Sequence, residues 1–223
     1  MQELDTLLEE SKVLGKFTNN QKQQLASLAI RRILKRNESL YQQGELWLNV
    51  LLIATGKLQS VINTLDGRSF VVSTWEKRDE FWPHTLFDGN PMPSTLEAVQ
   101  ESKIYQWDGE AVLRILFDNP QAVRALLGHM VTLVRKRRET ISDLAFQPVT
   151  SRLAKLLLDQ IPATEPSGQR DLTLPQIASM VASSPEVVCR SLYQLQRVGM
   201  LHITRATITL HDRAALERLI MIE

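Results

Sequence analysis

A glutamate and an arginine one helical turn apart, Glu186 and Arg190, have the most specific chemistry in this chain of 223 residues. Side chains at positions i and i+4 lie on the same face of a helix. Exposed residues of opposite charge at this spacing often form an intrahelical ion pair, worth roughly a few tenths of a kcal/mol. On a helix that enters the major groove of DNA, the arginine can instead bind O6 and N7 of guanine, and the glutamate can accept from N4 of cytosine. The elements that position the pair decide between these alternatives.

The residues before this pair predict a short helix followed by a tight turn. Thr173 and Gln176 have the spacing of a capping box, so a helix should begin at Leu174. Ala182 and Ser183 are small, as a tight turn between two helices requires. This is the expected first half of a helix-turn-helix.

A second helix should carry the glutamate and the arginine. Ser184 fits its N-cap, and Pro185 fits its first position, where the missing N–H of proline costs nothing. Gly199 should end it at the C′ position. Residues 202–204 and 207–210 alternate as the strands of a short β-hairpin would, which predicts a wing. The apolar side chains of this helix can pack inward: Val187, Val188, Leu192 and Leu195.

In this context we interpret the segment as a DNA-reading winged helix-turn-helix. Glu186 and Arg190 are the predicted base readers, with Cys189 beside them. The net charge of +1 is not that of a strongly basic nucleic-acid binder, so positive charge must be concentrated on one face. A dimer would help by doubling the phosphate contacts. The candidate contacts to the DNA backbone are Thr173, Ser183, Ser184, Tyr193, Arg197 and Arg205.

A longer helix should open at Asn119-Pro120 and run to Phe146. Its apolar residues form a heptad seam over three heptads, interrupted by the charged Arg137. A helix packed on its own domain is one explanation, but a seam of this length favours a two-stranded coil and hence a homodimer. The seam residues are Val123, Leu127, Met130, Val134, Ile141 and Leu144.

The region between Arg36 and Trp107 has short apolar runs separated by turn signals, which predict an antiparallel sandwich or barrel. Helices are expected at 20–33, 108–116 and 149–161, and residues 162–170 should form a linker between helices. The predicted strands are 39–41, 49–54, 58–63, 69–74, 95–99 and 103–107.

The amino-acid composition limits the class of protein to which the chain can belong. Apolar residues make up 43% and charged residues 23% of the chain, which is ordinary for a soluble globular protein. No run of about 18 apolar residues predicts a membrane span, and the acidic N-terminal segment has no signal-peptide pattern. We therefore expect a cytoplasmic protein without membrane contacts.

The order of these elements resembles the cyclic-AMP receptor protein / fumarate–nitrate regulator (Crp/Fnr) superfamily of bacterial transcription factors over nearly the whole chain. The resemblance implies an α+β fold with three parts. These are an N-terminal double-stranded β-helix (a jelly roll of the cyclic nucleotide-binding type) at 1–118, a dimerisation helix at 119–146 and a winged helix-turn-helix at 147–223. The matching residues are Gln43-Gly44-Glu45, Gly56, Gly67, Asn119-Pro120, Leu144-Ala145-Phe146, Arg152-Leu153-Ala154, Ile177-Ala178, Val181, Ser184, Glu186 and Arg190.

The resemblance implies roles for the base readers. In the family the matching Glu and Arg read the TGA core of each half of a palindrome, a role that Glu186 and Arg190 inherit. The cyclic-AMP branch has a further arginine just before the Glu, where this chain has Pro185. The residue before the Arg is usually Gly or Ser, and here it is Cys189. We expect a TGA-containing half-site without that extra contact; a redox role for Cys189 and its burial against the first helix both stay open.

The resemblance also locates an altered effector pocket. Pro83-His84 stand where cyclic-nucleotide binders have Gly-Glu, and Met92 stands where they have the arginine that pairs with the cyclic phosphate. A methionine cannot neutralise a phosphate. We therefore predict that the protein does not bind cyclic AMP in the manner of the family. The degenerate pocket comprises Trp82, Pro83, His84, Met92 and Ser94, with Arg137 and Arg138 at the positions of the adenine-contacting residues.

No cofactor is predicted. The single cysteine excludes internal disulfides, a four-cysteine zinc site and an iron–sulfur cluster. A haem-based gas sensor would need an axial ligand, for which His84 or His129 is the candidate, although a scattered histidine is far more often an ordinary residue. The tryptophans are expected in the barrel core, the alternative being an aromatic effector pocket: Trp47, Trp75, Trp82 and Trp107.

Two other function classes were weighed against a regulator. A cupin-like barrel enzyme needs clustered His and Glu ligands on neighbouring strands, yet only His84 of the four histidines lies in the barrel. No catalytic residues and no metal site are predicted. An interaction adaptor without DNA binding would suit the nearly balanced charge of 149–223. The leading hypothesis is a homodimeric regulator whose partners are double-stranded promoter DNA, a second copy of the chain and RNA polymerase.

Overall fold

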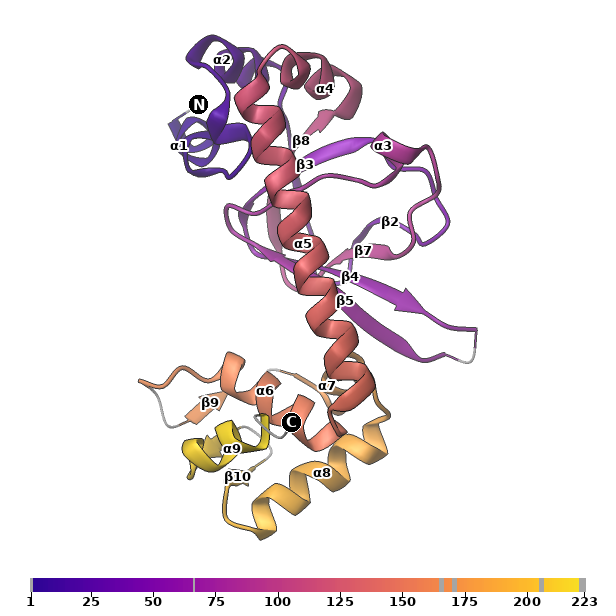
Figure 1. Cartoon of the computed structure of the whole chain (residues 1–223), viewed down its shortest axis with the longest axis vertical. Coiled ribbons are helices and arrows are strands. Elements are labelled where there is room, and N and C mark those ends of the chain that lie inside the picture. Colours follow the sequence, from indigo (N-terminus) through magenta and orange to yellow (C-terminus); the bar gives the residue numbers. More distant parts are fainter. Residues whose placement is uncertain (1, 66, 165–166, 170–171, 205–206, 221–223) are drawn as a thin grey trace. The chain divides into compact units, whose positions relative to one another are not determined.

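The computed structural model describes residues 2–65, 67–164, 167–169, 172–204 and 207–220 (Figure 1). The chain divides into two compact units. The N-terminal unit comprises Met1–Asn63 and Val72–Lys136, and the C-terminal unit comprises Thr64–Val71 and Arg137–Glu223. The long helix is thus shared between the units, so a separate dimerisation domain at 119–146 stays a prediction.

The N-terminal unit begins with α1 (Gln2–Glu10), a 3-10 turn (Leu14–Lys16) and α2 (Asn19–Leu28). Thr18 and Gln21 form a capping box that starts α2. The predicted helix 20–33 is wrong beyond Leu28, because Ile30–Leu34 forms strand β1 and pairs with β8. Strand pairing with a distant segment outweighs the short amphipathic pattern there.

Among the described residues of the first 108, eight strands form two four-stranded sheets, ordered β1-β8-β3-β6 and β2-β7-β4-β5. This is the jelly-roll arrangement, and the six predicted strands all form, while β1 and β6 were not predicted. Besides β1, the strands are β2 (Ser39–Tyr41), β3 (Asn49–Thr55), β4 (Lys57–Asn63), β5 (Ser69–Glu76), β6 (Glu80–Phe81), β7 (Thr95–Ala98) and β8 (Ser102–Asp108).

Strand β3 is the centre of the barrel because both of its faces are buried. Leu51 and Ile53 face the barrel core together with Met92, while Val50 and Leu52 pack in the cluster that holds the helices. Its run of apolar residues without alternation is typical of a strand covered on both sides. Trp107 on β8 is 1% exposed and Trp82 is 6% exposed, but both pack in the cluster that holds the helices. Of the four tryptophans predicted in the barrel core, Trp47 and Trp75 pack against it, and both are half-buried.

Helix α3 (Thr85–Asp88) lies between β6 and β7 in the chain, whereas α4 (Gly109–Phe117) and α5 (Pro120–Phe146) follow the last barrel strand, β8 (Figure 1). Asn119 starts α5, because its Oδ1 accepts from the backbone N–H groups of Gln121 and Ala122, both at 3.1 Å. Its Nδ2 donates to the carbonyl of Lys16 at 3.0 Å. The predicted opening of the long helix at Asn119-Pro120 is confirmed, and its first turns are tied to the N-terminal segment.

From residue 147 on, the described part of the C-terminal unit forms a three-stranded sheet and four helices. A third strand, β9, lies within the predicted linker 162–170 and pairs with β11, with Ile208 opposite Gly168. The linker prediction was wrong there, because a three-residue Ser-Gly-Gln strand has no alternating pattern to reveal it. The elements are α6 (Val149–Gln160), β9 (Ser167–Gln169), α7 (Leu174–Met180), α8 (Pro185–Arg197), β10 (Leu201–Ile203), β11 (Thr207–Leu210) and α9 (Arg213–Ile220).

The two units together confirm the predicted α+β fold, a jelly roll, a long helix and a winged helix-turn-helix. No helix among the described residues combines the length and the apolar character that a membrane crossing needs. Over the same residues, no three His, Cys, Asp or Glu side chains gather as metal ligands would.

Candidate nucleic-acid interface

The first helix of the helix-turn-helix, α7, begins and ends through local hydrogen bonds. The Thr173 N–H donates to Gln176 Oε1 at 2.8 Å, and the Gln176 N–H donates to Thr173 Oγ1 at 3.4 Å, which confirms the capping box. The turn that follows contains Ala182 at a φ of +52°, a backbone conformation that residues other than glycine rarely adopt. The Ser183 N–H closes the turn by donating to the Ala178 carbonyl at 2.9 Å.

The second helix, α8, has the predicted ends. Ser184 is the N-cap and accepts from the Val187 N–H at 3.4 Å, and Pro185 is the first helical residue. Gly199 has a φ of +77°, and the Met200 N–H donates to the Leu195 carbonyl at 3.0 Å. This glycine-terminated ending fixes where α8 stops and where the wing strand β10 begins.

Helix α8 has an apolar inner face and a polar outer face. Val188, Leu192 and Leu195 are buried, whereas Glu186 and Arg190 are both exposed. Among the described residues, no ion pair within 4.0 Å joins Glu186 to Arg190 or to any other residue. The intrahelical ion pair that would have given both side chains an ordinary role is absent from this structure, so both charged groups face solvent.

The Glu186 carboxylate is held in its charged form. A hydrogen bond with the Ser184 side chain keeps its pKa below the usual value. A carboxylate accepts hydrogen bonds only, which suits an amino group such as N4 of cytosine. The N-cap of α8 therefore also favours the charged form of a predicted base reader.

The other predicted DNA contacts fall into three groups. Tyr193 is 64% exposed and Arg197 is also exposed, both on α8. Ser183 and Ser184 are half-buried at the turn, and Thr173 is exposed but hydrogen-bonded to Gln176 within its own cap. Cys189 is half-buried on α8. Arg205 lies outside the described residues.

The residues of the predicted effector pocket have different surroundings in the structure. Met92 is 1% exposed within the apolar barrel core, and the buried Ser94 hydroxyl bonds to the Ser60 hydroxyl. Trp82 and Pro83 are buried, while His84 is exposed at the start of α3. Arg137 and Arg138 belong to the C-terminal unit, where burial lowers the pKa of Arg137. Where the resemblance implies a phosphate-binding arginine, the structure has a methionine among apolar side chains.

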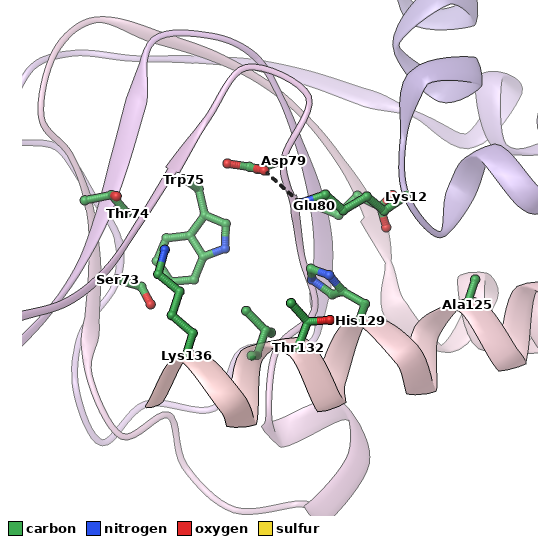
Figure 2. Close-up of a pocket in the computed structure, with 11 residues that line it drawn as sticks. Lys12, Ser73, Thr74, Trp75, Asp79, Glu80, Ala125, His129, Thr132 and Lys136 are labelled. Atoms are coloured by element: carbon green, nitrogen blue, oxygen red, sulfur yellow. Dashed lines mark ion pairs between the residues drawn. The ribbon is translucent and has the colours of Figure 1, made fainter. Parts of the chain in front are cut away.

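A cavity of about 410 Å³ lies beside α5 in the N-terminal unit (Figure 2). Figure 2 shows His129 pointing from α5 toward the strand that carries Trp75. Burial lowers the pKa of His129, and the nearby Lys12 lowers it further. Lys12 Nζ lies 3.8 Å from Asp79 Oδ1 at the rim. Sequence reasoning singled out His129 and Trp75 but not Lys12, Asp79 or Glu80, because these come together only through the fold.

The outer surface of α5 carries an apolar stripe. Leu127, Val131, Val134 and Ile141 are 62%, 53%, 59% and 64% exposed. Val123 and Met130, which the heptad seam also included, instead pack against the core of the N-terminal unit. Leu144 is 39% exposed. The stripe therefore follows Leu127, Val134 and Ile141 of the predicted seam and adds Val131.

Two family models match the chain. A Crp-like helix-turn-helix domain matches residues 151–219, and a cyclic nucleotide-binding domain matches residues 31–119. The CRP-like cAMP-activated global transcriptional regulator of Mycobacterium tuberculosis is 26% identical over 189 residues, which cover 82% of this chain and 84% of that protein. The cAMP-activated global transcriptional regulator Vfr of Pseudomonas aeruginosa is 29% identical over 193 residues, 82% of this chain and 90% of that protein.

Solved structures with the same fold are also known. A putative transcriptional regulator of the Crp/Fnr family from Eubacterium rectale has a TM-score of 0.80 at 20% identity, covering 95% of this chain and 99% of that one. The c-di-GMP responsive global regulator CLP of Xanthomonas campestris has a TM-score of 0.76 at 18% identity, covering 86% and 99%.

A cyclic nucleotide-binding-type barrel, a long helix and a helix-turn-helix in this order define a class of transcription regulator. The chain belongs to the Crp/Fnr superfamily of transcription factors, and its helix-turn-helix is a DNA-binding domain. Its relatives are regulators rather than enzymes.

Proposed function

We propose that the protein is a homodimeric regulator that reads palindromic promoter DNA through Glu186 and Arg190 and whose sensor domain does not bind cyclic AMP in the family manner. The observation that carries the proposal is the exposure of both charged side chains in the first turns of α8, without an ion pair among the described residues. An exposed charged group that is not neutralised by an ion pair can interact with a base edge.

The apolar stripe on α5 supports the dimer. Four large apolar side chains that are each more than half exposed follow one side of a helix, at spacings of four, three and seven residues. Such a stripe is typical of a two-stranded coil. Two copies would present two α8 helices, which suits half-sites whose centres lie about one helical turn apart.

The barrel supports a change of effector. A cyclic phosphate needs a cation or several donors, and the matching region offers Met92 and Pro83, both buried, and the Ser94 hydroxyl already bonded to Ser60. The barrel core is apolar instead and includes aromatic rings. The ring centroid of Tyr41 lies 5.4 Å from that of Trp47 and 6.0 Å from that of Phe81. These neighbours suit an apolar group better than a phosphate.

A duplex titration tests the DNA-binding part of the proposal. Fluorescence anisotropy should compare a palindrome with TGA-containing half-sites, centred about 10 base pairs apart, with a duplex of shuffled half-sites. We expect the palindrome to bind about a thousandfold or more tighter, with affinity falling steeply as salt rises. Equal affinities for both duplexes would contradict sequence-specific reading, and no salt-dependent binding to either would favour the adaptor alternative.

A further inference from the structure

The side chain of Arg152, on α6, connects two segments of the C-terminal unit that are far apart in the sequence. Its Nη1 donates to the carbonyl of Gln147, directly after α5, at 2.7 Å. Its Nε donates to the carbonyl of Val181 at 3.0 Å, and its Nη2 to that of Ala182 at 3.4 Å. Val181 and Ala182 form the turn between α7 and α8. One guanidinium thus holds the end of the long helix and the turn before the DNA-reading helix.

The turn between α7 and α8 contains a strained residue that the hydrogen bonds from Arg152 stabilise. Ala182 is in the left-handed region at a φ of +52°, which costs a non-glycine residue conformational energy. The carbonyl groups on either side of its N–H, those of Val181 and Ala182, are the ones that Arg152 binds. Hydrogen bonds from a charged, half-buried donor are stronger than neutral ones.

A neighbouring ion pair reinforces the same connection. Lys155, one turn further along α6, places its Nζ 2.6 Å from Asp143 Oδ2 on α5. Asp143 also interacts favourably with the Arg152 charge. Among the described residues, Lys155 binds only the side chain of Asp143, whereas Arg152 also binds the turn of the helix-turn-helix.

We infer that Arg152 is a positioning residue that fixes the orientation of α8 relative to the last turn of α5. The inference rests on the proposed function, in that α8 reads DNA. The guanidinium has five N–H donors in a fixed planar arrangement, so it can bind carbonyl groups in two directions at once. A lysine keeps the charge but lacks this planar arrangement.

The chain supplies a matched control in Arg213. Its Nη1 donates to the Ile161 carbonyl at 2.7 Å and its Nη2 to the Leu158 carbonyl at 3.2 Å. Arg213 is also half-buried, and it ties α9 to the end of α6 without contacting the turn. Arg213→Met should destabilise the unit by a similar mechanism without releasing α8.

The experiment compares full-length wild type, Arg152→Met, Arg152→Lys and Arg213→Met by amide hydrogen exchange, thermal unfolding and DNA binding. We expect Arg152→Met to raise exchange in residues 178–188 and to weaken binding of the palindrome about tenfold or more, since each 1.4 kcal/mol is tenfold. Arg152→Lys should fall between wild type and Arg152→Met. Arg213→Met should leave the exchange rates of residues 178–188 and the affinity for the palindrome within about threefold of wild type, even where it lowers the unfolding temperature.

Three outcomes would overturn the inference. One is unchanged exchange in residues 178–188 for Arg152→Met and Arg152→Lys. Another is an equal loss of DNA affinity in Arg152→Met and Arg213→Met. The third concerns the slope of log affinity against log salt concentration. If Arg152→Met lowers the magnitude of this slope by about 1, Arg152 is a direct phosphate contact. Hydrogen exchange is measured without DNA. It therefore tests whether Arg152 holds the turn even if the protein does not read DNA as proposed.

Discussion

The indole Nε1 of Trp82, a residue of the predicted effector pocket, donates a hydrogen bond to Glu80 Oε2 at 2.9 Å. The other oxygen of this carboxylate accepts from the backbone N–H groups of Val13 at 2.8 Å and Leu14 at 3.2 Å. Glu80 is 4% exposed. Burial raises its pKa, and the three hydrogen bonds oppose that rise. One buried carboxylate thus joins Trp82 to the start of the 3-10 turn between α1 and α2.

Removing this carboxylate should destabilise the N-terminal unit. Glu80→Ala leaves three buried N–H donors without their acceptor, which should lower the free energy of unfolding by about 3 kcal/mol or more in urea denaturation. Glu76→Ala is the control, since that side chain is 61% exposed and makes a surface ion pair with Lys57. Its cost should stay below about 1 kcal/mol. Equal losses from the two substitutions would refute the joining role of Glu80.

Stability should depend on pH through His129. Burial lowers its folded-state pKa, with Lys12 adding to the effect and Asp79 opposing it. The unfolded chain then binds a proton more readily than the folded one below about pH 6.5, so the stabilising contribution is present above that pH and is lost as pH falls. Relative to His129→Gln, wild type should lose stability between pH 7.5 and 5.5 in denaturant titrations. If the difference in unfolding free energy between wild type and His129→Gln is constant from pH 7.5 to 5.5, the expectation is contradicted.

The apolar stripe on α5 should set the oligomeric state. Val134→Glu places a charge among Leu127, Val131 and Ile141, so we expect dissociation to monomers in sedimentation velocity and a loss of palindrome affinity of about a hundredfold. Arg135→Glu changes the charge of an adjacent exposed residue and should leave the dimer intact. Dimers of unchanged affinity in Val134→Glu would show that the copies associate elsewhere.

Cyclic AMP should not act on this protein. With Met92 in place of the phosphate-binding arginine and Pro83-His84 in place of Gly-Glu, we expect no heat of binding in calorimetry at ligand concentrations up to about 1 mM. DNA affinity should be the same with and without the nucleotide. Saturable binding at micromolar concentrations, or tighter DNA binding in its presence, would show that the barrel recognises the nucleotide by other groups.

Features set by neighbouring residues could be predicted from the sequence. The capping box of Thr173 and Gln176, the N-cap of Ser184 and the left-handed Gly199 each act within a few residues along the chain. These local rules located both helices of the DNA-binding motif. The exposure of Glu186 and Arg190 followed from the helical period alone.

Features that depend on distant segments could not be predicted in the same way. Ile30–Leu34 is a strand because β8 lies beside it, and Ser167–Gln169 is a strand because β11 does. The seam of α5 shows the same limit, since only packing against the barrel turns Met130 inward and leaves Val131 exposed. Arg152 stood out in the sequence only as part of a family motif, because two of its three carbonyl partners, those of Val181 and Ala182, lie 29 and 30 residues away.

The most direct test of base reading pairs a protein variant with a base variant. Replacing the guanine of each TGA half-site by 7-deazaguanine removes the N7 acceptor that Arg190 should bind. Wild type should lose about 1–3 kcal/mol of binding free energy on this duplex, and Arg190→Ala, already weakened, should lose nothing further. Arg197→Ala, a change of the same kind on the same helix, should keep the full wild-type penalty. An Arg190→Ala variant that still discriminates against 7-deazaguanine as strongly as wild type would contradict the assignment of Arg190 as the guanine reader.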